Sequence, residues 1–121
     1  MHYLMIVRFD DEARLTPEDA AQMGPATEAW VGELDTRGVR LEGHQLRPPS
    51  DATTLRRRDG ALVVTDGPFA ETKEQIAGYD LLVCDDHAEA VEAAAAHPIA
   101  RWGALELRPF HEDVAAGEDL R

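Results

Sequence analysis

Apolar and polar positions follow two periods along the chain, and these predict where strands and helices lie. Nearly every residue in the range 3–9 is apolar, β-branched or aromatic, which is typical of a central strand covered on both faces. Thr16-Pro17 then offers a hydroxyl cap followed by a proline, as at a helix start. A helix is therefore expected from Pro17 to about Arg37, where Gly38 ends it. Gly24-Pro25 is expected to kink this helix or to split it.

The middle of the chain predicts a strand followed by a hairpin. Residues 39–46 are expected to form the strand, which ends before Pro48-Pro49. Two further strand-like runs, 53–58 and 61–65, are joined by Asp59-Gly60. This two-residue link is a strong hairpin signal, because a type I′ turn needs positive φ at both positions.

The turn also fixes which hairpin residues share a face. Arg58 should lie opposite Ala61, and Thr53 opposite Asp66. One face then carries Thr53, Leu55, Arg57, Leu62, Val64 and Asp66. This face is the more apolar, so we expect it to point inward, with Asp66 where the core opens into a cleft. Arg56 and Arg58 are expected on the other face, at a charged edge strand or a dimer contact.

The C-terminal half predicts a second strand-helix-strand unit. Residues 76–84 read as a strand, with Gly78 at a bulge or a close backbone approach. Asp86 and Glu89 predict the start of a helix that runs to about His97. Alternating residues then indicate a last strand over 102–109.

This order of elements predicts the fold class. Two β-α-β halves around a hairpin favour an α+β, ferredoxin-like sandwich over residues 1–110, followed by a polar tail, 111–121. Helices would cover one face of the sheet. Because the other face would be bare and partly apolar, we expect a second copy to cover it, giving a homodimer packed sheet to sheet as a dimeric α+β barrel.

Length and charge narrow the classes of function. The 121 residues indicate one domain, and the net charge of −12 disfavours nucleic acid and anionic membranes as partners. No apolar run approaches the roughly 20 residues of a membrane helix, and the N-terminus resembles a strand rather than a signal peptide, so we expect a cytoplasmic protein. Cys84 alone cannot form an intrachain disulfide and is expected to be a core thiol. The histidines show no metal-ligand spacing, so no metal or cofactor is expected.

One short stretch carries a family resemblance. Asp66-Gly67-Pro68-Phe69, followed by Glu71, Lys73, Glu74 and Gly78-Tyr79, resembles the YCII-related proteins, specifically their DGPF-domain branch. The resemblance extends over most of the chain, through Leu46-Arg47-Pro48-Pro49 and Val64-Thr65 to Glu106-Leu107-Arg108-Pro109. It implies a dimeric α+β barrel and a family whose biochemical role is mostly unassigned.

The resemblance does not carry over a catalytic pair. More distant YCII-like proteins are thought to use a His-Asp pair whose histidine lies on the first helix. Here the predicted first helix, Pro17 to Arg37, contains no histidine. Members of the DGPF branch often occur beside or fused to extracytoplasmic-function sigma factors, which implies a regulatory or accessory role.

The candidate site is a cleft at the Asp66–Glu74 loop. Asp66 and Glu71 are the candidate acid-base groups, although Asp66 is equally explained as a turn residue that accepts backbone N–H bonds. Lys73 is the candidate anchor for an anionic substrate, or one member of a solvated ion pair. The other candidate substrate-binding residues are Tyr79, Arg57 and His44. A role in the core is the alternative for Tyr79, and His97 is expected to be a cation that caps a helix C-terminus.

Two functions of different class follow. The first is a cofactor-free acid-base catalyst, such as a lyase or isomerase, acting on a small polar or aromatic molecule in this cleft. The second is a non-catalytic regulatory module that binds a protein partner or a small effector. A catalyst should hold Asp66 in a concave pocket, whereas a binding module should show an exposed apolar patch outside the dimer contact.

Overall fold

The predicted order of elements is confirmed, and the chain is an α+β protein. The computed structural model describes residues 1–10, 15–70 and 74–111. Its elements are β1 (His2–Phe9), α1 (Pro17–Thr36), β2 (Arg40–Gln45), the short 3-10 helix η1 (Pro49–Asp51), β3 (Thr53–Arg58), β4 (Ala61–Asp66), β5 (Gln75–Val83), α2 (His87–Ala95), the 3-10 helix η2 (Pro98–Arg101) and β6 (Ala104–Pro109). Residues 112–121 of the expected polar tail lie outside the described residues.

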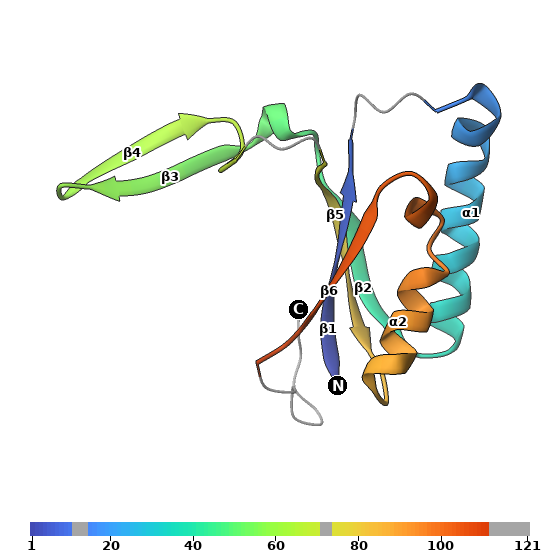
Figure 1. The fold of residues 1–121 in the computed structure, drawn as a ribbon. Coiled ribbons are helices and arrows are strands. Elements are labelled where there is room, and N and C mark those ends of the chain that lie inside the picture. The colour runs from blue at the N-terminus through green and yellow to red at the C-terminus, as the bar shows by residue number, and fades with distance from the viewer. Residues whose placement is uncertain (11–14, 71–73, 112–121) are drawn as a thin grey trace.

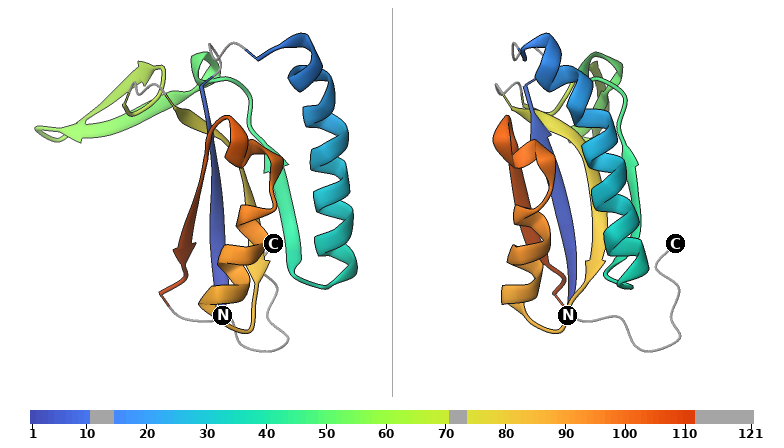
Figure 2. Two further views of the ribbon diagram at one scale, coloured as in Figure 1. Left: turned by 45° about the vertical axis from the view of Figure 1, so that its right-hand side comes forward. Right: turned by 90° about the vertical axis from the view of Figure 1, so that its right-hand side faces the viewer.

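The body of the molecule is a four-stranded antiparallel sheet with both α-helices on one face (Figures 1 and 2). The strand order is β2-β5-β1-β6, so the first strand of each β-α-β half lies in the middle. The register slips between Val7 and Arg8, opposite Gly78. A Cβ at Gly78 would lie 2.9 Å from the carbonyl oxygen of His44, so the expected bulge and close approach are both confirmed.

Helix α1 begins as expected and is not split. The Thr16 hydroxyl accepts a hydrogen bond of 3.0 Å from the backbone N–H of Asp19, and Gly38 beyond the helix has a φ of 72°. The helix continues through Pro25, so of the two expected outcomes, a kink or a split, the split is wrong. Pro25 and Ala21 lie on the exposed side of α1, where solvent can reach the carbonyl that the missing N–H of proline leaves unbonded.

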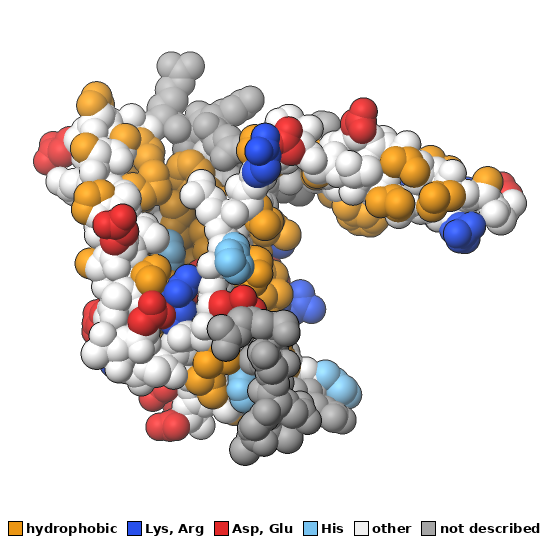
Figure 3. All heavy atoms as spheres, turned by 180° about the vertical axis from the view of Figure 1, so that it is seen from behind, with side chains coloured by type: hydrophobic (Ala, Val, Ile, Leu, Met, Phe, Trp, Pro, Cys, Tyr) orange, Lys and Arg blue, Asp and Glu red, His pale blue; other side chains and the backbone are white. Residues whose placement is uncertain are grey.

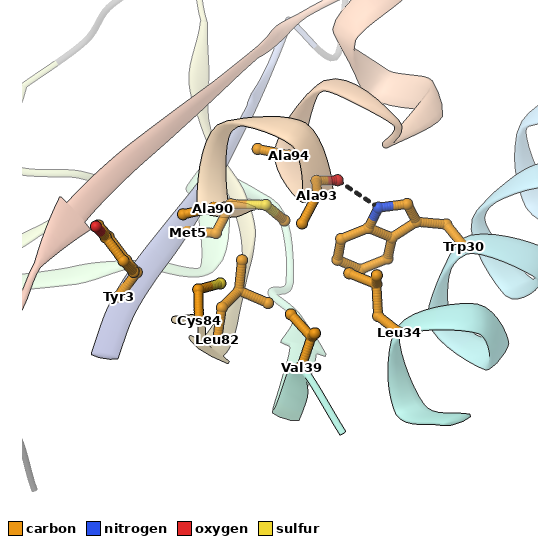
Figure 4. Close-up of a cluster of buried hydrophobic side chains, with 10 residues drawn as sticks. All are labelled: Tyr3, Met5, Trp30, Leu34, Val39, Leu82, Cys84, Ala90, Ala93 and Ala94. Atoms are coloured by element: carbon orange, nitrogen blue, oxygen red, sulfur yellow. Dashed lines mark hydrogen bonds between the residues drawn. The ribbon is translucent and has the colours of Figure 1, made fainter. Parts of the chain in front are cut away.

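The core lies between the sheet and the two helices (Figure 4). Trp30 of α1 is 4% exposed, and its indole N–H donates a 2.9 Å hydrogen bond to the carbonyl of Ala93 in α2. This bond joins the two helices over the small alanine side chains of α2. Cys84 is buried in the same cluster, as expected, and burial raises the pKa of its thiol.

His97 corrects the expectation of a cationic helix cap. The chain turns into η2 after α2, which buries His97 with its ring centroid 4.7 Å from that of Trp30. Its Nδ1 accepts a 3.0 Å hydrogen bond from the backbone N–H of Ile99, so that nitrogen carries no proton. Burial lowers the pKa of His97, and the nearby Asp80 carboxylate opposes this effect. The neutral ring is therefore the form that the fold holds.

A buried ion pair joins β2 to β5. Asp80 is 7% exposed, and the Arg40 Nε donates a 2.8 Å hydrogen bond to its Oδ1. Burial opposes the charge of Arg40, but hydrogen bonds to Asp80 and Asp35 raise the pKa of the guanidinium. Gly43 lies directly under this pair, and a Cβ there would collide with the Asp80 carboxylate. The glycine therefore leaves the space that the Asp80 carboxylate and the Arg40 guanidinium occupy.

The hairpin β3–β4 has the predicted register but not the predicted burial. Asp59 and Gly60 have φ values of 52° and 79°, and Arg58 pairs with Ala61 and Thr53 with Asp66 as expected. The hairpin projects from the sheet on the side opposite the helices (Figure 1). Every residue of β4 is exposed, so the expectation that the Asp66 face points into the core is wrong. Turn chemistry sets the register locally, whereas burial depends on where the hairpin lies relative to the body.

Candidate functional site

A pocket of about 840 Å³ lies where the hairpin leaves the sheet. It is lined by the ends of β1 and β5, by the segment from Leu46 through η1 into β3, and by Pro68–Ala70 after β4. Its apolar lining includes Leu46, Pro68, Phe69 and Ile76. A cavity of this size can hold a small organic molecule.

The loop after β4 is held in place by hydrogen bonds to the start of β3. The backbone N–H of Gly67 donates to the carbonyl of Ala52 at 2.8 Å, and the Thr54 hydroxyl donates to the carbonyl of Gly67 at 2.8 Å. Gly67 has a φ of 105°, a conformation that favours glycine. These bonds present Phe69 at the pocket, with its ring 4.5 Å from the Arg56 guanidinium and 74% of the residue exposed.

Two arginines bring positive charge to the pocket. Arg8 lies on β1 and pairs through Nε with Glu106 at 3.1 Å, and Arg47 pairs through Nε with Asp51 at 2.8 Å. Hydrogen bonds from Arg8 and from Arg108 lower the pKa of Glu106, so this partner is ionised at neutral pH. Each of these pairs uses the Nε of its arginine, and a guanidinium has further N–H donors for a ligand. The pocket therefore combines apolar walls with donors suited to an anion.

The residues predicted for the site are only partly brought together. Asp66 is exposed at the end of β4 and is not among the residues that line the pocket. Arg57 lies on the same hairpin face, but Asp66 is opposite Thr53, four residues further along β3. At the usual rise of a strand this separates Arg57 from Asp66 by about 13 Å, too far for an ion pair between them. Glu71 and Lys73 lie outside the described residues.

Two other predicted residues, His44 and Tyr79, do meet. They are register partners on β2 and β5, and their ring centroids are 5.8 Å apart. The His44 Nε2 lies 3.5 Å from a carboxylate oxygen of Glu42. Tyr79 is half-buried and also pairs with Ile6, on the sheet face that the helices leave open. Tyr79 is not part of the helix-side core, so the alternative of a core role is wrong, and its role as a substrate-binding residue stays a prediction.

The comparisons identify the family. A model of the YCII-related domain matches residues 1–112. The chain belongs to the YCII-related family. An uncharacterised protein of Rhizobium meliloti (strain 1021) is 44% identical to this YCII-related chain over 103 residues, which cover 69% of the chain and 82% of that protein. The resemblance carried by the Asp66–Glu74 stretch is thus confirmed at the level of the family.

Two kinds of feature are absent from the described part of the YCII-related chain. Within residues 1–10, 15–70 and 74–111, no three His, Cys, Asp or Glu side chains are grouped so as to hold a metal ion. In the same part of the chain, no helix combines the length and the apolar character that crossing a bilayer requires.

Sequence reasoning missed the two arginines of the pocket and Glu42. Arg8 lies near the end of an apolar strand, and Arg47 precedes two prolines. The two arginines are 39 positions apart, and no local sequence pattern indicates that they lie close together in the fold. The alternation of β2 does place Glu42 and His44 on one face, and that signal was available in the sequence.

Proposed function

We propose that this YCII-related protein binds a small organic anion with an apolar or aromatic body in the pocket at the root of the hairpin. The observation that carries the proposal is the juxtaposition of Arg8 and Arg47 with the apolar walls of one pocket. A carboxylate on the ligand would meet the free guanidinium donors, and its body would pack on Phe69 and Ile76. Arg is well suited to this task because its planar fork binds carboxylates in two-point contacts.

Charge supports a site-specific role for these arginines. The chain carries −12 overall, so its average field repels anions. An anionic ligand is therefore favoured only where local cations and exclusion of water offset that field. The pocket supplies the guanidinium groups of Arg8 and Arg47, each beside one carboxylate partner, together with apolar walls for the body of the ligand. This combination supports an anion with an apolar body rather than a neutral ligand of the same shape.

Acid-base chemistry is the second candidate, and the contact between His44 and Glu42 favours it. The His44 imidazole lies beside the Glu42 carboxylate and the Tyr79 ring, and these are side-chain types that enzymes use for proton transfer. These groups lie on the open sheet face, and Ile76, three residues before Tyr79 on β5, lines the pocket. Asp66, Glu71 and Lys73 remain candidates in this scheme, which requires a second copy to cover Asp66.

The proposed working unit is a homodimer of ferredoxin-like sandwiches that forms an α+β barrel. The strand order β2-β5-β1-β6, with both helices on one face, supports the ferredoxin-like description. Half-buried apolar residues Leu4, Ile6 and Val83 lie on the open face, where the register places them opposite Leu81, Tyr79 and His2. A second sheet packed at about 10 Å would cover these side chains and enclose the His44 cluster.

Calorimetric titration with benzoate and with benzamide tests the binding function. Both have an aromatic body, but only benzoate is an anion. Benzoate should bind more tightly, and Arg8→Gln should weaken its binding by at least about tenfold, the worth of one hydrogen bond between charged groups. Arg108→Gln is the matched control, because Arg108 also pairs with Glu106 but does not line the pocket. Equal affinity for the two compounds, or equal effects of the two substitutions, would contradict the proposal.

Deuterium incorporation separates catalysis from binding alone. Small 2-oxo acids are incubated with the protein in D₂O, and proton NMR follows the loss of the signal next to the carbonyl. An acid-base catalyst should accelerate exchange, and His44→Ala should abolish the acceleration while benzoate still binds. If no 2-oxo acid exchanges faster with the wild type than with His44→Ala, the regulatory, effector-binding function is the one that remains.

A further inference from the structure

The hairpin β3–β4 leaves apolar side chains uncovered on its Asp66 face. Leu55, Leu62 and Val64 share this face and are 59%, 53% and 57% exposed. In Figure 3 hydrophobic side chains extend along the projecting hairpin, well away from the body. An isolated two-stranded hairpin is marginally stable in water, so a hairpin of this kind needs a surface to pack on. Within residues 1–10, 15–70 and 74–111, the body of the chain meets this face only at the root, where Leu55 lines the pocket, and Leu62 and Val64 stay exposed.

The length of the hairpin indicates how far it reaches. Each strand has six residues, so the hairpin extends about 20 Å from its root. It projects on the side of the open sheet face (Figure 1). Two sheets packed face to face lie only about 10 Å apart. In a sheet-to-sheet dimer the hairpin therefore extends beyond the gap and runs along the other protomer.

Charge favours another copy of this chain as the occupant. Residues 53–66 contain three arginines and two aspartates, a formal charge of +1, whereas the whole chain carries −12. The rest of the chain is therefore strongly acidic and attracts a slightly basic arm. Arg56 and Arg58 carry this excess on the face opposite Leu55, because Arg57 and Asp66 on the Leu55 face balance each other. In a dimer with a two-fold axis, the hairpin of each copy would pack on the other copy. The same arrangement would then cover the open sheet face and the hairpin face that carries Leu55, Leu62 and Val64.

We propose that the β3–β4 hairpin is an arm that clasps the partner protomer, with its Leu55–Leu62–Val64 face buried in the interface. Asp66 and Arg57 lie on that face, so they too enter the interface. Asp66, exposed in a single chain, then belongs to a surface formed by two chains. This inference rests on the homodimer of the proposed function. Leu55 also lines the ligand pocket, so the proposed interface begins at the edge of that pocket.

Two measurements test the arm. Light scattering on a size-exclusion column gives the dimer dissociation constant, and hydrogen exchange reports the protection of amides 53–66 at low and high protein concentration. The wild type should be a dimer whose amides 53–66 become protected as the dimer forms. Val64→Asp should raise the dissociation constant by about 100-fold, because each dimer would bury two new carboxylates in apolar contacts.

Val91→Asp is the matched control. Val91 is 47% exposed on α2, in the helix layer, and should leave the dissociation constant unchanged. Circular dichroism checks that both variants fold. A wild-type dimer with unprotected 53–66 amides and an unaffected Val64→Asp variant would overturn the arm and leave the dimer and the pocket standing. A wild type that stays monomeric would overturn the arm and the dimer together, while benzoate binding still tests the pocket.

Discussion

Removing the cation of the buried ion pair should destabilise the fold severely. Arg40→Met keeps most of the alkyl length but leaves the Asp80 carboxylate, 7% exposed, without its 2.8 Å partner. Breaking a buried pair from one side typically costs about 3–5 kcal/mol, because the remaining charge is desolvated and unpaired. Since domains of this kind have a free energy of unfolding of about 5–15 kcal/mol, this is a large fraction of the total.

Urea unfolding followed by tryptophan fluorescence measures this loss. Arg47→Met is the matched control, because Arg47 pairs with Asp51 at the same 2.8 Å but its side chain is 85% exposed. A surface pair contributes about 0–1 kcal/mol, so the control should be nearly neutral. Adding Asp80→Leu to Arg40→Met should recover much of the stability. Equal, small losses in the two single variants would refute the assignment of Asp80 and Arg40 as a buried pair.

Two further predictions concern burial and close packing. Acidification from pH 7 to 5 should destabilise the wild type more than His97→Asn, because burial lowers the pKa of His97 and the unfolded chain therefore binds the proton first. For each pH unit below the unfolded pKa near 6.5, the wild type should lose up to about 1.4 kcal/mol more of its free energy of unfolding than the variant loses, as urea titrations at each pH would record. Equal losses in the two proteins would contradict this prediction. Gly43→Ala should cost about 3 kcal/mol in thermal unfolding, because its Cβ would separate Asp80 from Arg40, whereas Gly32→Ala in open space on α1 should stabilise by about 0.5–1 kcal/mol. If Gly32→Ala were the less stable of the two variants, the Asp80–Arg40 pair would not require glycine at position 43.

The features that the sequence predicts correctly depend on a few neighbouring residues. The pairing of Thr53 with Asp66 follows from positive φ at Asp59 and Gly60, which depends on two residues and their neighbours. The N-cap of α1 at Thr16 is likewise a matter of one turn. Such features need no knowledge of the rest of the fold, and the structure has them as expected.

What the sequence could not predict depends on distant parts of the chain. The apolar pattern of Leu55, Leu62 and Val64 indicates that one hairpin face needs cover, but it does not say which surface covers it. His97 follows the last turn of a helix in the sequence, but the turn into η2 packs it against Trp30. In both cases the pattern gives the chemistry of a side chain, and the tertiary path decides its surroundings.

In the candidate site, too, local patterns predict some features, and the tertiary fold decides the others. His44 and Tyr79 were recognised as possible site residues, and pairing of β2 with β5 brings them together. Asp66 was placed in a cleft because its face was expected to point inward, and the single chain leaves it exposed. The pocket lies one loop away, at Pro68 and Phe69, where Arg8 from the first strand supplies the charge.

The most direct test of anion binding at the hairpin root is an NMR titration of ¹⁵N-labelled protein with benzoate. The backbone amides of Leu46, Phe69 and Ile76 should shift together and reach saturation, and benzamide at the same concentration should shift them far less. Amide shifts confined to α2, or shifts of equal size with both compounds, would contradict it.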